Sequence, residues 1–206
     1  MLRRMDPLTA PQRRVLGTLI EKAFTTPAGY PLTLNALVAG CNQLTCREPV
    51  TQYPEAEVAR AVQELKRLHL VQEAEYDKGA RVDRFQHAVS ALWEERPRAI
   101  LAELLLRGPQ TAGELKTNAA RLAPMPDLPA VAAVLAAFAA AGLVRELPRQ
   151  PGKSSVRFDH LLYAEGVAAT APSTLEERVA KLEAEVEALR RAISSPGGRG
   201  DPGPSA

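Results

Sequence analysis

The tetrapeptide "RFQH" at residues 84–87 returns as "RFDH" at residues 157–160, which is 73 positions later. The chain contains only three histidines and four phenylalanines, so this motif uses two of each. The same shift places apolar residues on apolar residues upstream of the motif: Val58 on Val131, Val62 on Leu135, Leu65 on Phe138, and Leu70 on Leu143. The sequence therefore carries an internal duplication, which predicts two copies of one structural unit.

Three predicted helices precede the motif in each copy. They cover residues 11–24, a segment opening at Thr33, and residues 54–70 in the first copy, and residues 96–108, a segment opening at Thr111, and residues 127–143 in the second. In the first helix of each copy, apolar residues recur at i, i+1, i+4 and i+5, as in an amphipathic helix. The threonine that opens each second helix carries a hydroxyl suited to an N-cap.

Two strands joined by a glycine-containing turn follow the helices, near residues 70–76 and 82–88 in the first copy. Three helices and then two strands is the order of a winged helix-turn-helix. The sequence thus predicts a mainly α protein with small β wings, an α+β fold, with winged-helix domains at residues 1–92 and 93–165. The repeated motif becomes the second wing strand, with Phe buried and with Arg and His on the opposite face.

Three segments carry a family resemblance: "VLGTLIEKAFTTPAGYPLTLNALVAGCNQ" from residue 15, "LLRGPQTAGELK" from residue 105, and "LPRQPGKSSVRFDHLL" from residue 147. They resemble the YceH family, bacterial proteins built of two winged-helix units. The resemblance covers about residues 8–165 together with a helical tail. It departs at Cys46 and Glu48, where the family more often has Asn and Asp. It implies the tandem winged-helix fold but no activity.

The composition is that of an ordinary globular protein, with 46% apolar and 24% charged residues. No apolar run approaches the ~18 residues that a membrane span needs. The N-terminal residues lack the apolar region of a secretory signal. Two cysteines do not make a disulfide framework, so we expect a cytoplasmic protein.

Catalytic and metal-binding chemistry are not indicated by the sequence. No Cys or His pair follows Cys41 and Cys46 at zinc-finger spacing. The histidines fall in no motif with a positioned nucleophile, and we interpret His87 and His160 as strand-end hydrogen-bonding residues. The stretch "GPQTAG", residues 108–113, lacks the Lys-Ser/Thr ending of a phosphate loop. We expect a protein that is not an enzyme and holds no metal or cofactor.

Charge positions, rather than net charge, carry the case for nucleic acid, since the net charge is only +2. On the third helix of the first copy, Arg60, Gln63 and Arg67 lie opposite the apolar stripe. Arg and Gln are residue types that read guanine and adenine edges. Further basic residues are candidate phosphate contacts: Arg47, Lys78, Arg81, Arg84, Arg149, Lys153 and Arg157. Against DNA binding, Glu57 and Glu64 border the same face and would repel phosphate.

The third helix of the second copy differs in kind, because residues 128–142 contain no charged side chain. Its exposed side is predicted to present alanine, which cannot read bases but suits packing against a helix of the first copy or of a second subunit. We expect a DNA-associated transcriptional regulator. The alternative is a non-enzymatic scaffold whose winged helices dock partner proteins. The stretch "TTPAGYPLTLNAL", residues 25–37, is either a packed connector or a recognition loop for such a partner.

The C-terminal segment has a heptad pattern. After a linker at residues 166–173, a helix at residues 174–193 begins with a capping box at Ser173 and precedes a disordered tail at residues 194–206. Its apolar seam consists of Leu175, Val179, Leu182, Val186, Leu189 and Ile193. Val and Ile at a with Leu at d favour a parallel two-stranded coiled coil, so we expect a homodimer. In the alternative, the seam folds back onto its own winged helices.

Overall fold

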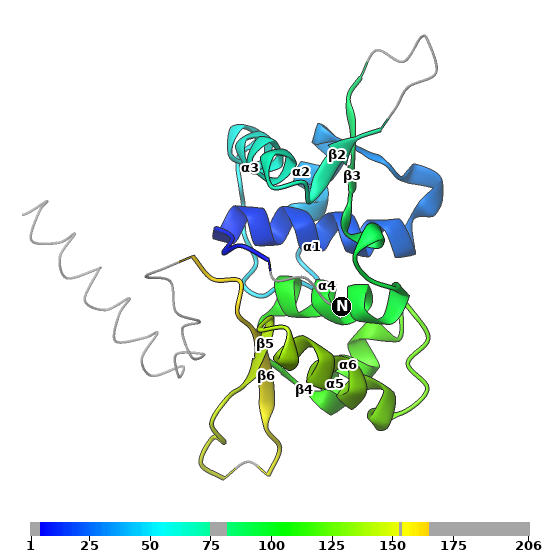
Figure 1. The fold of residues 1–206 in the computed structure, drawn as a ribbon. Coiled ribbons are helices and arrows are strands. Elements are labelled where there is room, and N and C mark those ends of the chain that lie inside the picture. The colour runs from blue at the N-terminus through cyan, green and yellow to red at the C-terminus, as the bar shows by residue number, and fades with distance from the viewer. Residues whose placement is uncertain (1–4, 75–81, 153, 165–206) are drawn as a thin grey trace, which may run out of the picture. The chain divides into compact units, whose positions relative to one another are not determined.

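The two copies of the duplicated sequence fold into the same order of elements in the computed structural model, which describes residues 5–74, 82–152 and 154–164 (Figure 1). The first repeat consists of α1 (Ala10–Thr25), β1 (Leu32–Thr33), α2 (Leu34–Cys41), α3 (Glu55–Arg67), β2 (Val71–Glu73) and β3 (Arg84–His87). The second consists of α4 (Glu95–Arg107), β4 (Gln110–Thr111), α5 (Ala112–Ala119), α6 (Leu128–Ala140), β5 (Val144–Glu146) and β6 (Arg157–His160). Short 3-10 helices lie at Pro27–Gly29 and Val89–Ala91. The predicted α+β class is confirmed.

Each repeat closes with a three-stranded antiparallel sheet, in the order β1-β3-β2 in the first repeat and β4-β6-β5 in the second. The register is shared: Phe85 pairs with Leu32 and His87 with Val71, while Phe158 pairs with Gln110 and His160 with Val144. The sequence predicted the two wing strands but missed β1 and β4. Two-residue strands give no alternation to detect.

The predicted burial of Phe in the repeated motif is confirmed, but the predicted orientation of its His is wrong. Phe85 and His87 are both buried, with 5% and 6% of their surface exposed, and Arg84 is exposed. Residues i and i+2 of a strand point to the same face, so Phe and His belong together and Arg faces the other way. In β6 the His160 ring is likewise buried, and Phe158 packs against the core.

The second helix of each repeat begins at its predicted N-cap, whereas the third helix of the first repeat ends earlier than predicted. The hydroxyls of Thr33 and Thr111 accept hydrogen bonds from the backbone N–H groups of Ala36 and Glu114, as predicted. The predicted third helix of the first repeat runs too far, since α3 ends at Arg67. His69, within the predicted helix at residues 54–70, lies exposed after the end of α3 at φ 56°.

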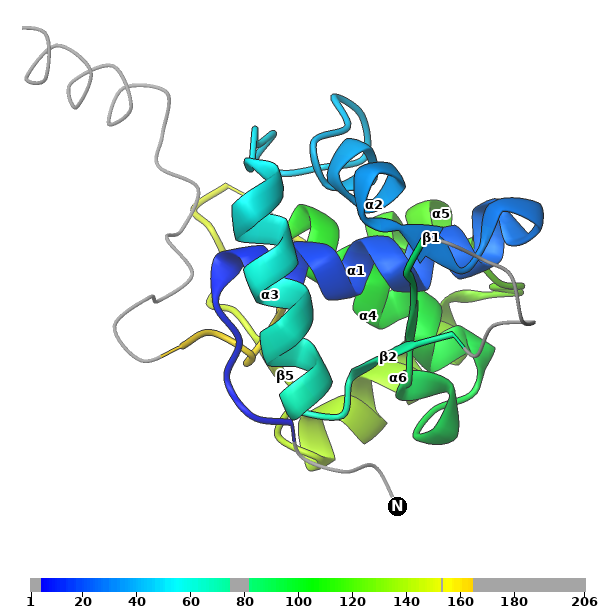
Figure 2. The ribbon, with the colours of Figure 1, turned by 90° about the horizontal axis from the view of Figure 1, so that it is seen from above.

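Helices α1 and α4 join the two repeats. Helix α1 packs against α3 on one side and against α4 on another, as Figures 1 and 2 show. The approach is close at Gly17, where a Cβ atom would lie 2.9 Å from Leu106 Cγ and 3.1 Å from Leu105 Cβ. Any larger residue there would push the helices apart. One cluster of buried apolar residues therefore extends through both repeats.

The segment between α1 and β1 packs onto its own repeat. Tyr30 is half-buried against the core, and its hydroxyl accepts a hydrogen bond of 2.7 Å from the His87 backbone N–H. Of the two interpretations of residues 25–37, this contact favours the packed connector.

The predictions for the linker, the heptad helix and the C-terminal tail fall on residues 166–206, outside the described residues. Within the part of the chain that the structure describes, no helix has the length and apolar character to cross a membrane.

Candidate nucleic-acid interface

The exposed face of α3 carries the residues predicted to read bases. Val58, Val62 and Leu65 are fully buried against the core. Arg60, Gln63 and Arg67 are exposed at i, i+3 and i+7, so they line one outward face of the helix. Within the described ranges, no ion pair involves either arginine. Both guanidinium groups are therefore available to a ligand.

The charged neighbours of this face are partly engaged within the protein. The Glu64 carboxylate accepts a hydrogen bond of 2.8 Å from Gln12 Nε2 on α1. Lys66 forms an ion pair with Glu73 on β2. Glu57 is half-buried. The hydrogen bond orients the Glu64 carboxylate, but because Gln12 is neutral it leaves the negative charge of Glu64 in place.

The arginines of the wing strands, Arg84 and Arg157, each donate a hydrogen bond within the protein. In the first repeat, Arg84 is exposed, and its Nη1 donates to the Pro31 carbonyl at 2.9 Å. In the second, the half-buried Arg157 donates to the Pro109 carbonyl in the same way. Each arginine thus ties the second wing strand to the proline that precedes the short first strand of its sheet. Arg149 is exposed after β5. Lys78, Arg81 and Lys153, also predicted to contact phosphate, lie outside the described residues.

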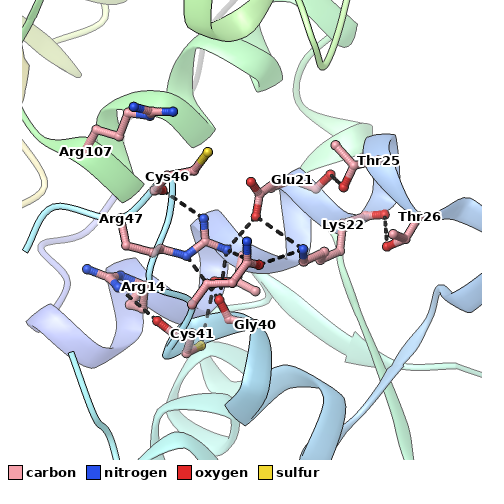
Figure 3. A network of polar contacts seen from close by, with 12 residues as sticks. Arg14, Glu21, Lys22, Thr25, Thr26, Gly40, Cys41, Cys46, Arg47 and Arg107 are labelled. Carbon is pink, nitrogen blue, oxygen red and sulfur yellow. Dashed lines mark hydrogen bonds and ion pairs between the residues drawn. The ribbon is translucent and has the colours of Figure 1, made fainter. Parts of the chain in front are cut away.

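Arg47 was predicted to contact phosphate, but it is buried and does not belong to the interface. Its side chain has 0% exposure, and its Nη2 lies 2.5 Å from Glu21 Oε2 (Figure 3). The same guanidinium donates to the carbonyls of Gly40 and Cys46, each at 2.9 Å. A buried guanidinium whose donors are used inside the protein is not available to a phosphate. Arg47 is therefore a structural residue.

Glu21 lies at the centre of an ion network that sequence reasoning missed. Its Oε1 is 2.7 Å from Arg121 Nη2, which also lies 2.8 Å from Glu103 Oε1. Glu103 in turn pairs with Arg107 at 2.9 Å. Burial alone would raise the pKa of Glu21, but hydrogen bonds and charges from Arg47 and Arg121 outweigh it and hold that pKa below its usual value. The network joins α1 and the loop after α2 to the second repeat.

Arg14 is a second buried arginine beneath the same loop. Its Nη1 donates to the Cys41 carbonyl at 2.9 Å, and its Nη2 donates to the Pro49 carbonyl at 2.5 Å. Burial, followed by the nearby charge of Arg47, lowers its pKa. The only sequence signal was position, since Arg14 adjoins Val15 on the core side of the predicted helix. Two arginines therefore satisfy carbonyl groups at the end of α2 and in the loop that follows it.

The two histidines of the repeated motif, His87 and His160, are buried. His160 Nδ1 accepts a hydrogen bond of 3.2 Å from the Leu162 backbone N–H, which fits its predicted role at a strand end. Desolvation by burial, and then the charge of Arg98, lowers the pKa of His87 to about 4. Burial and the charge of Arg13 lower the pKa of His160 to about 3. Both rings are neutral at neutral pH.

Both cysteines are free thiols. Cys41 is buried with its Sγ 3.7 Å from Thr18 Oγ1, and burial raises its pKa to about 11. Among the described residues, no group of three or more His, Cys, Asp or Glu side chains converges on a common point.

The outer face of α6 is uncharged, and its alanines are exposed. Val131, Leu135 and Phe138 are buried in the second repeat. The exposed positions equivalent to Arg60, Gln63 and Arg67 are Ala133, Ala136 and Ala140. Helix α6 packs on α4, α5 and β5, and these alanines face solvent. The packing of this face against a helix of the first repeat, predicted as one option, is therefore not observed among the described residues.

Comparison with known proteins gives a family. A family model described as "Protein of unknown function, DUF480" matches residues 8–153. A UPF0502 protein from Dechloromonas aromatica (strain RCB) is 46% identical over 200 residues, covering 87% of this chain and 91% of the relative. One from Geobacter sulfurreducens is 48% identical over 192 residues, covering 85% and 87%. One from Acidovorax sp. (strain JS42) is 44% identical over 211 residues, covering 92% of each.

Proposed function

The chain belongs to the DUF480 family of proteins of unknown function, and from its own residues we propose that it binds double-stranded DNA as a regulator. We assign each repeat as a winged helix-turn-helix, with α3 and α6 as third helices and the hairpins β2–β3 and β5–β6 as wings. In such domains the third helix enters the major groove, and its outward side chains meet base edges. The first repeat supplies that helix in α3.

One observation carries the proposal: the contrast between equivalent positions of α3 and α6. Both helices bury the same apolar stripe, so packing imposes the same demands on each. At the outward positions, α3 has Arg60, Gln63 and Arg67, and α6 has only alanine. A helix that needed only solubility would not have to place its two arginines and one glutamine on a single outward face. These side chains have the geometry for bidentate hydrogen bonds to guanine and adenine.

The phosphate contacts are assigned to the wing. Arg84 is exposed at the start of β3, and it would give sequence-independent affinity. Lys78 and Arg81 remain predicted contacts of the same kind. Because each phosphate contact releases condensed counterions, the affinity falls as salt rises.

The test measures the affinity of the full chain for a duplex selected from genomic fragments, over a range of salt. Arg60→Ala and Arg67→Ala each weaken binding by ~1–3 kcal/mol if each makes a bidentate base contact. Arg84→Ala makes the slope of log K against log salt shallower by ~0.9, and this change depends little on the sequence of the duplex. Arg96→Ala, which removes an exposed charge on α4, is the control. Equal affinities for wild type, Arg60→Ala and Arg67→Ala would exclude the α3 interface.

A second candidate function, a protein-interaction scaffold, is supported by the uncharged outer face of α6. Small side chains allow a partner helix to approach closely, and the absence of charge removes the desolvation cost. If this face binds a partner protein, Ala136→Glu abolishes that complex and leaves the DNA affinity of α3 unchanged. A partner that binds wild type and Ala136→Glu equally would rule out α6 as its docking face.

A further inference from the structure

The position of α3 depends on the loop at residues 42–54, which joins α2 to α3 and is longer than its counterpart at residues 120–127. The two ends of the loop are tied together, since the Tyr53 backbone N–H donates to Asn42 Oδ1 at 2.8 Å and Asn42 Nδ2 donates to the Tyr53 carbonyl at 2.9 Å. Beneath the loop lie the guanidinium groups of Arg14 and Arg47. Whatever holds these arginines therefore holds the start of α3.

Two contacts connect this loop to the second repeat. The Glu48 backbone N–H donates to the Leu106 carbonyl, at the end of α4, at 2.8 Å. The other contact runs through Glu21, whose two carboxylate oxygens have different partners: Oε2 meets Arg47 and Oε1 meets Arg121. Glu21 is 1% exposed and Arg47 is 0% exposed, so neither charge is solvated by water.

We propose that Arg121, in the second repeat, is a positioning residue for the outward face of α3 in the first. The proposal rests on the DNA-binding function proposed above. Without Arg121, Glu21 Oε1 becomes a buried acceptor with no partner, and such a group is costly. The carboxylate then turns or admits water, and Arg47 loses the fixed anion that orients it. The carbonyls of Gly40 and Cys46 lose their donor geometry in turn, and the loop loosens ahead of α3.

Arg121→Ala is the informative variant because the fold has a reason to survive it. Glu21 keeps Arg47 as a partner, and Glu103 keeps Arg107. Lys116→Ala is the matched control. It removes one positive charge from α5, five residues before Arg121. Lys116 forms no ion pair among the described residues. Arg121→Lys, which restores a cation between the two carboxylates, serves as the rescue.

The first measurement is hydrogen exchange of the backbone amides, which needs no DNA. The amides of Glu48 and Tyr53 exchange about tenfold faster in Arg121→Ala, as expected for a local loss of one decade in the opening equilibrium. They are unchanged in Lys116→Ala and return toward wild type in Arg121→Lys. Unchanged exchange in Arg121→Ala would overturn the proposal, whatever the protein binds.

The second measurement is DNA affinity against salt, which separates positioning from direct contact. Arg121→Ala lowers the affinity for the selected duplex about tenfold and leaves the slope of log K against log salt unchanged. A slope that is shallower by ~0.9 would mean that Arg121 itself contacts a phosphate, and would overturn the proposal. Unchanged affinity with a loosened loop would overturn it too. If wild type binds no duplex, the proposed function fails and the positioning of α3 for DNA fails with it, while the exchange result alone still reports whether Arg121 holds the loop.

Discussion

At the scale of single residues, His87 on β3 and His160 on β6 have buried, neutral rings. The His87 ring lies beside Tyr30, with ring centroids 6.0 Å apart, and faces the positive charge of Arg98. His160 stacks on Tyr163 with centroids 4.2 Å apart, and its charged neighbours are Arg13 and Arg145. Burial and positive neighbours both disfavour the imidazolium form.

Acid therefore destabilises the fold through His87. Its pKa is about 4 in the folded chain, against an ordinary value of 6.5, so the unfolded chain takes up the proton first as the pH falls. The free energy of unfolding that depends on His87 is fully present above pH 6.5 and is lost as the pH falls from 6.5 to 4. At pH 5 the protein has lost about 2 kcal/mol of stability through His87. Urea unfolding from pH 7 to 5 measures it.

His87→Gln isolates this contribution from the other titrating groups. The variant loses less stability on acidification than wild type. If His87→Gln and wild type show the same pH dependence, the His87 ring is not held neutral by the fold.

At the scale of elements, α3 and α6 end in the same way with different residues. In each, the backbone turns into the left-handed region, at His69 with φ 56° and at the equivalent Gly142 with φ 68°. The same closing hydrogen bonds follow, from Leu70 N–H to the Leu65 carbonyl and from Leu143 N–H to the Phe138 carbonyl. Glycine adopts this conformation freely, and a residue with a Cβ does so at a cost.

His69→Gly is therefore predicted to stabilise the protein. Relief of the left-handed conformation contributes ~1–2 kcal/mol, and the greater freedom of glycine in the unfolded chain offsets ~0.4–1 kcal/mol of it, leaving about 0.5–1 kcal/mol. Gly142→Ala is the mirror control, predicted to destabilise, because a Cβ there meets no atom within 4 Å and only the backbone is strained. Urea unfolding at neutral pH measures both. A loss of stability in His69→Gly would contradict this reading of the helix end.

The elements predicted from the sequence were those with a local signal. The duplicated register and the threonine caps identified the helices and wing strands, because each depends on residues a few positions apart. Arg47 was misplaced because its buried partner, Glu21, lies 26 positions away and nothing local marks the pair. Glu21, Glu103 and Arg121 were missed for the same reason. The α3 face was predictable, since a 100° rotation per residue opposes it to Val58, Val62 and Leu65.

At the scale of the whole molecule, the heptad seam at residues 174–193 predicts a dimer. Full-length protein is expected at twice the chain mass of 22.2 kDa in sedimentation equilibrium or light scattering at tens of micromolar. A chain truncated after Pro172 is expected to be monomeric, because the seam is the apolar surface that pairs in a parallel coiled coil. A monomeric full-length protein would favour the alternative in which the seam folds back onto its own chain.

The two repeats have the same framework and different outward faces, and in the proposed function only α3 reads DNA. The most direct measurement is the fluorescence anisotropy of labelled genomic duplexes titrated with full-length protein, from low to physiological salt. We expect saturable binding at low salt, a linear fall of log K with log salt, and a preference among duplexes that Arg60→Ala reduces. Micromolar protein that binds no duplex at low salt would contradict this expectation.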